Sequence, residues 1–155
     1  MKIYAVRSTT LKFASVLILS LAVLASLIVI LPVSTTASAD ISYDRVYTSA
    51  DRIGFLSQFG WTVDEADVEE VNVTIPSEFD AVYSEYNDIQ KSQGLNLNKY
   101  RGKDVTRYTY KVTNYDGCDG TVYANLLVYK GKIVGGDLCC AENGGFVSGF
   151  DGKKV

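Results

Sequence analysis

The residues best suited to chemistry in this 155-residue chain are its three cysteines, Cys118, Cys139 and Cys140. Two of them are adjacent, and adjacent residues of a strand point to opposite faces of a sheet, so only one suits Cys118 as a partner. A nucleophilic thiol needs a neighbouring base or cation. The chain has no histidine, which excludes Ser-His-Asp and Cys-His mechanisms, imidazole zinc sites and pH switching through imidazole.

The cysteines have three interpretations. A hairpin turn at 130–131 sets Val122 opposite Cys139 and leaves Cys118 a few residues out of register, within reach of a disulfide. The candidate disulfide is Cys118–Cys140. The alternatives are a buried structural thiol and a catalytic thiol at Cys139 or Cys140. One unpaired thiol remains in any pairing.

The acidic residues match no ligand template. The run 64–70 and the loop 116–120 lack the spaced ligands and distal glutamate of a calcium loop, so we interpret them as a solvated strand edge and a turn. Asp137 and Glu142 could form a hydrolytic carboxylate pair, but isolated acids on a solvated sheet face are commoner, and we assign them no role. We predict no metal ion, no cofactor and no catalytic residue.

The chain is rich in tyrosine, with 11 residues of this type. So many rings cannot all enter the core of a small domain, and exposed rings on a sheet can stack on sugars or dock a peptide. We therefore predict a binding surface made of Tyr108, Tyr110, Tyr123 and Tyr129. The alternative is that these are ordinary half-buried strand residues.

Helices and strands that could position these residues are visible in the sequence. Capping boxes and helical spacing predict helices at 49–59 and 78–93. Alternating or continuous apolar residues predict strands at 71–75, 105–112, 122–129 and 133–140, with a short edge strand at 146–150. Gly135 and Gly136 indicate a bulge or a close approach. We expect an α+β fold, with two helices packed on one face of a small antiparallel sheet in the order α-β-α-β-β-β.

An apolar run from Phe13 to Val33 precedes these elements. It has no charged residue, follows three basic residues and exceeds the roughly 20 residues that span a bilayer. We predict a transmembrane anchor within residues 1–39, a tether at 40–48 and an extracytoplasmic domain at 49–155. The small residues ending at Ala39 also suit signal peptidase, so secretion after cleavage following Ala39 is the alternative.

Charge also restricts the partners. The chain has 15 basic and 18 acidic residues, and three of the basic ones lie in the leader, so the remainder has a net charge of −6. This argues against nucleic acid or an anionic lipid surface as the partner.

Six blocks of the sequence, together with their order along the chain, carry a resemblance. They lie at 55–61, 73–83, 90–94, 108–110, 124–129 and 135–137. Through these blocks the chain resembles a bacterial family catalogued as domain of unknown function 4830, found mainly in Gram-positive lineages. The resemblance implies a small exported or anchored domain and carries over no activity and no catalytic residue.

The sequence thus predicts a non-enzymatic extracytoplasmic module that is held in the membrane through residues 13–33. Its ligand would be a protein, a peptide or an envelope component. The alternative is a thiol-dependent redox or hydrolytic enzyme that uses Cys139 or Cys140. A third class is a structural part of a membrane complex.

Overall fold

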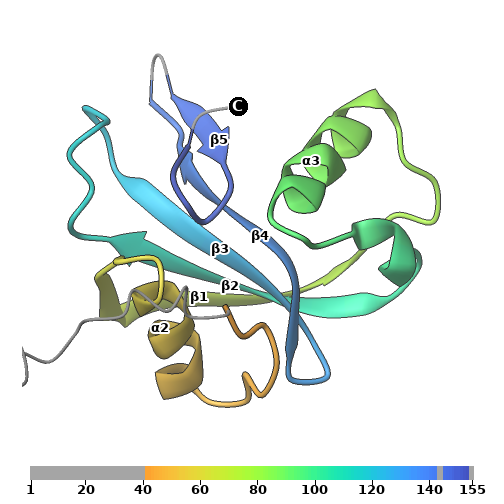
Figure 1. Cartoon of the computed structure of the whole chain (residues 1–155), viewed down its shortest axis with the longest axis horizontal. Helices are drawn as coiled ribbons and strands as arrows, with labels where there is room; N and C mark the ends of the chain where they lie inside the picture. The colour runs from red at the N-terminus through yellow and green to blue at the C-terminus, as the bar shows by residue number, and fades with distance from the viewer. Residues whose placement is uncertain (1–40, 143–144, 154–155) are drawn as a thin grey trace, which may run out of the picture. The chain divides into compact units, whose positions relative to one another are not determined.

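The computed structural model describes residues 41–142 and 145–153 (Figure 1). The predicted leader at 1–39, with its apolar run at 13–33, lies outside these residues. Within the described part, no helix is both long and apolar enough to cross a membrane.

The described chain forms two α-helices, one short 3-10 helix and five strands. Their bounds are α2 Ser49–Ser57, β1 Val63–Thr74, α3 Ala81–Ser92, η1 Leu97–Tyr100, β2 Asp104–Val112, β3 Val122–Tyr129, β4 Lys132–Cys140 and β5 Phe146–Ser148. The strands make one antiparallel sheet in the order β1-β2-β3-β4-β5. The predicted α+β class, with two helices and an antiparallel sheet, is confirmed.

Side-chain caps decide where the two helices begin. Thr48 and Asp51 form the expected capping box of α2, in which the Thr48 hydroxyl accepts the Asp51 N–H at 3.2 Å. The second helix begins at Ala81, three residues later than predicted. Its N-cap is Asp80, whose carboxylate accepts the Tyr83 N–H at 2.7 Å, so the preceding residues remain outside the helix.

Strand β1 is longer than the predicted strand 71–75. It begins at Val63 and includes the acidic run 64–70, which is mostly exposed. The run was interpreted from the sequence as a solvated strand edge, which agrees with the structure. Its charged residues show no alternation of apolar and polar side chains, so the pattern did not indicate where the strand begins. Strand β1 is the outermost strand of the sheet, and charged side chains are common on such edges because they oppose pairing with another chain.

The register of the β3–β4 hairpin differs by one residue from the prediction. Val122 pairs with Cys140 instead of Cys139, because the pairing shifts after the turn. Val134 has no partner in this register, whereas the residues on either side of it do. One extra residue in β4 therefore makes a bulge beside Gly135, close to the glycine pair that indicated one.

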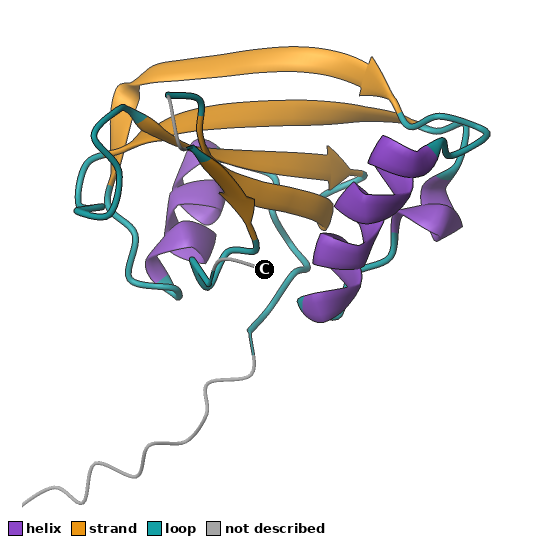
Figure 2. Ribbon diagram, turned by 90° about the horizontal axis from the view of Figure 1, so that it is seen from above, coloured by secondary structure: helices purple, strands orange, loops and turns teal. Residues whose placement is uncertain are grey.

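Both faces of the sheet are covered, and by different elements. Leu126 and Leu127 are adjacent in β3 and point to opposite faces, yet both are buried, at 0% and 6% exposure. Phe55 and Leu56 of α2 pack in the cluster that contains Leu126. Tyr83 of α3 packs in the cluster that contains Leu127. The prediction that both helices cover one face is therefore wrong, and Figure 2 shows the helices near opposite ends of the strands.

The edge of β4 is closed by three separate pieces of the chain. Strand β5 pairs with its last residues. In the middle, Gln90 accepts the Gly136 N–H at 2.8 Å and Gln93 donates to the Gly136 carbonyl at 2.9 Å. At the start, residues 43–46 form backbone hydrogen bonds with 131–133. This part of the segment expected to be a tether is thus built into the sheet.

Candidate functional site

The four tyrosines of the predicted binding surface do not lie together. Tyr110 is fully buried, and its hydroxyl accepts from the Arg52 Nε at 2.8 Å. Tyr108 lies on the same face, under the Arg52 guanidinium. Tyr123 and Tyr129 point to the other face, where Tyr129 packs against a ring of η1. Tyr123, at 36% exposure, is the member of this set that lines an open groove.

That groove, which we name the face groove, crosses four strands on the face that carries Leu127. It has a volume of about 500 Å³ and is lined by Asp67, Glu69, Arg107, Thr109, Tyr123, Asn125 and Cys139. The alternation of side chains along the strands brings these residues to one face. Helix α3 covers the neighbouring part of that face and leaves this part open.

A chain of hydrogen bonds forms the floor of the face groove. Thr109 donates from its hydroxyl to the Asn125 carbonyl oxygen at 2.8 Å. The Asn125 amide donates to one Asp137 oxygen at 2.9 Å, and the Tyr86 hydroxyl donates to the other at 2.7 Å. The chain links β2, β3, β4 and α3. It fixes the amide of Asn125 in one orientation, because both ends of that amide have partners.

Asp137 is the buried acid of this chain, at 6% exposure. Burial raises the pKa of Asp137 above the usual range, although the hydrogen bonds from Asn125 and Tyr86 oppose the shift. The pKa of Tyr86 is raised well above its usual value by burial and by the charge of Asp137. Burial thus makes ionisation of both groups less favourable than in water.

The cysteines have different environments. Cys118 and Cys140 form a disulfide, with Cα atoms 6.7 Å apart, and Cys140 is buried in the larger core cluster. Cys139 is free and half-buried, and it accepts a hydrogen bond from the Asn125 amide at 3.4 Å. Burial and the neighbouring Asp137 raise the pKa of the Cys139 thiol. Little of this thiol is therefore in the nucleophilic thiolate form at neutral pH.

Arg107 supplies the positive charge of the face groove. One of its terminal nitrogens lies 3.4 Å from a Glu69 oxygen at the rim. Its Nε is buried and has no acceptor within the described residues. A buried donor without a partner is unfavourable, so Arg107 has hydrogen-bonding capacity that nothing in the described chain uses.

Acidic residues do not gather into a metal site in the described part of the chain, where no group of three or more potential ligands occurs. Glu69 faces Arg107, whereas Glu70 points to the opposite face and accepts from the Tyr108 hydroxyl at 3.4 Å. Asp137 is buried beside α3, and Glu142 is exposed beyond the end of β4. The structure records no interaction between these two carboxyl groups.

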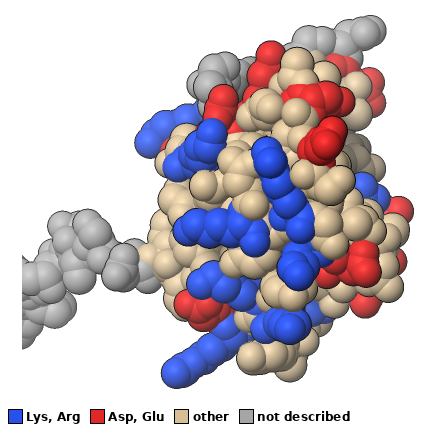
Figure 3. Space-filling model, turned by 90° about the vertical axis from the view of Figure 1, so that its right-hand side faces the viewer, with Lys and Arg blue, Asp and Glu red and all other residues tan. Residues whose placement is uncertain are grey.

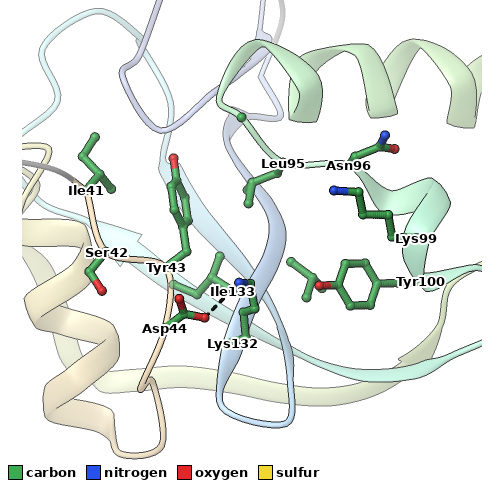
Figure 4. A pocket seen from close by; sticks show the side chains of 12 residues that line it. Ile41, Ser42, Tyr43, Asp44, Leu95, Asn96, Lys99, Tyr100, Lys132 and Ile133 are labelled. Atoms are coloured by element: carbon green, nitrogen blue, oxygen red, sulfur yellow. Dashed lines mark ion pairs between the residues drawn. The ribbon is translucent and has the colours of Figure 1, made fainter.

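A second hollow, which we name the hairpin groove, lies between η1, the start of β4 and residues 41–44 (Figure 4). Its volume is about 510 Å³, and Lys99, Tyr100 and Lys132 line it. Lys132 forms an ion pair with Asp44 at 2.9 Å. Sequence reasoning missed this basic region. The available signal was the stretch 89–103, which has four basic residues and no acidic one.

These features define a small α+β domain with an open polar groove on its sheet. The family described as domain of unknown function (DUF4830) matches residues 55–138, more than half of the chain. The chain belongs to this family, which confirms the resemblance seen in the sequence. The match includes every residue that lines the face groove except Cys139. Comparisons with curated proteins and with solved structures found no match.

Proposed function

We propose that this protein is a non-enzymatic binding module that works outside the cytoplasmic membrane and takes a glycan unit or a short peptide in the face groove. The observation that carries the proposal is the exposed ring of Tyr123, which lines the groove together with the charged side chain of Arg107 and the fixed amide of Asn125. An aromatic surface beside fixed polar groups suits sugars and peptides. The groove volume of about 500 Å³ suits a ligand of this size.

The chemistry of the groove favours binding over reaction. The raised pKa of Cys139 opposes nucleophilic attack. Both oxygens of Asp137 already accept hydrogen bonds, from Asn125 and Tyr86. Cys140 is held in the disulfide. The proposed module therefore offers a rigid hydrogen-bonding surface and no activated nucleophile.

The location is also part of the proposal and is supported by the sequence. The uncharged run at 13–33 is long enough to span a bilayer, and the basic residues before it place the N-terminus in the cytoplasm. Membrane fractionation with alkaline carbonate extraction tests this: an anchored chain stays in the membrane pellet. Release of a chain that begins at Asp40 would instead establish secretion after cleavage.

The binding role is tested with the full chain in detergent, applied to arrays of envelope glycans and of short peptides. For a ligand found there, we expect Tyr123→Ala and Asn125→Ala each to weaken binding about tenfold or more, the effect of losing one well-packed contact. The matched control is Tyr47→Ala, since Tyr47 is 72% exposed and does not line the groove. Blank arrays, or equal binding by all three variants, would contradict the proposal.

A further inference from the structure

Five exposed basic residues gather where η1 and the β3–β4 hairpin meet. We name this surface the basic face; its residues are Lys99, Arg101, Lys103, Lys130 and Lys132. The rings of Tyr100 and Tyr129 lie 5.6 Å apart and hold the two segments together. Figure 3 shows Lys and Arg side chains gathered on one side of the molecule.

Most of these charges have no acidic partner. Within the described residues, Lys132 forms an ion pair with Asp44, and the other four form none. The guanidinium of Arg101 instead lies over the ring of Phe79 at 4.4 Å. Four exposed cations are therefore free to meet anionic groups from outside the domain.

The acidic run 64–70 lies at the other end of the sheet, whereas Asp44 and Asp104 lie near the basic face. Along the β1–β2 pair, Thr74 pairs with Asp104 beside η1, whereas Val63 pairs with Val112 at the far end. The acidic run 64–70 belongs to that far end, as do the residues of the face groove on β1. The net charge of −6 is therefore unevenly distributed: five acidic residues lie in the run 64–70, and five basic residues form the basic face.

The chain enters the domain beside the basic face. Ile41, the first described residue, lines the hairpin groove together with Lys99 and Lys132 (Figure 4). The predicted membrane span ends at Val33, and seven residues separate it from Ile41. Even when fully extended, this link reaches at most about 28 Å. An anchored chain therefore keeps this end of the domain near the headgroups.

We propose that the basic face docks on anionic phospholipid headgroups of the membrane that anchors the chain. This inference rests on the anchoring in the proposed function. Phosphate groups of the lipids would take the place of the missing acidic partners, and each Lys or Arg at such a surface strengthens binding about fivefold. Docking in this orientation directs the acidic end of the sheet, and with it the face groove, away from the membrane.

The test uses the full chain in nanodiscs that carry a nitroxide on a lipid headgroup, with line broadening of backbone amides as the readout. In discs that contain phosphatidylglycerol we expect broadening at 99–103 and 130–132 and none at 64–70. In discs of phosphatidylcholine alone we expect it to disappear. High salt should reduce it, because exposed charges are screened beyond roughly a Debye length.

A charge-reversal variant and a matched control make the test specific. Lys99→Glu with Lys130→Glu changes two exposed residues of the basic face. It should lower the equilibrium constant of docking about 25-fold or more, at about fivefold per residue. Lys111→Glu with Lys153→Glu makes the same change in charge elsewhere on the exposed surface and should leave docking intact. Unchanged amide shifts outside the altered sites show that each variant is folded.

The outcomes separate the two proposals. A chain that does not elute with the discs refutes the anchoring, and with it the docking. A chain that elutes with the discs but shows equal broadening in both lipids, or broadening centred on 64–70, refutes the docking alone. Saturable shifts at 99–103 with inorganic phosphate, without broadening in anionic discs, would also overturn it and would identify free phosphate as the ligand.

Discussion

The Cys118–Cys140 disulfide gives the most direct test of the structure. It joins residues 22 positions apart and links the β2–β3 connection to the last residue of β4. In the chain-entropy model, closing a loop of this length stabilises the folded state by about 3 kcal/mol, because it restricts the unfolded chain. We expect Cys118→Ala to lower the free energy of unfolding by this amount. The midpoint of thermal unfolding should fall by about 12 °C for a domain of this size.

The measurement is urea unfolding of the full chain in detergent, followed by circular dichroism, with and without reductant. Cys118 is the better site to change, because it is only half-buried and Cys140 belongs to the core. Reductant should lower the stability of the wild type to that of Cys118→Ala and should not affect the variant further. Cys139→Ala keeps the disulfide and serves as the control for loss of a thiol.

Two results would refute this reasoning. Alkylation of the unfolded, unreduced chain should add one label, at Cys139, so a mass that shows three labels would exclude the bond. Equal unfolding free energies for the oxidised and reduced wild type would show that the bond forms without restricting the unfolded chain as calculated.

Three further predictions follow from the buried polar groups. Because burial raises the pKa of Asp137, the folded state binds its proton more tightly than the unfolded state, so wild-type stability should fall as pH rises from about 4 through the raised value. Asp137→Asn should remove that part of the pH dependence in urea unfolding, and identical pH profiles would contradict the assignment. Cys139 should react slowly with iodoacetamide in the folded protein and quickly after unfolding; rapid native labelling would instead indicate a low thiol pKa. Gln90→Ala leaves the buried Gly136 N–H without its acceptor and should cost about 1–3 kcal/mol. Gln58→Ala, at an exposed glutamine, is its control in urea unfolding and should have little effect.

Local signals in the sequence predicted the elements better than their packing. The capping box at Thr48 and the turn at Lys130-Gly131 determine structure through neighbouring residues, and both occur as expected. The arrangement of the helices depends on contacts between distant segments. The two adjacent buried residues Leu126 and Leu127 show that both faces need a cover, but no local pattern tells which helix covers which face.

Only part of the face groove could be predicted from the sequence. Alternation in β2 places Arg107 and Thr109 on the face opposite Tyr108, and this follows from the strand alone. The link from Thr109 through Asn125 to Asp137 requires the register of three strands, and the bulge at Val134 shifts that register by one residue. The basic face was missed because net charge carries no information about where charges lie.

The backbone hydrogen bonds between residues 43–46 and the start of β4 affect how the domain bears mechanical load. A force applied through the N-terminus reaches these bonds first, and they connect directly to the β3–β4 hairpin in the middle of the fold. Tension would therefore act on a central hairpin, and helix α2 would lie outside the primary load path. The structure should yield first at this short pairing, and only after it has opened would the force pass along the chain to α2.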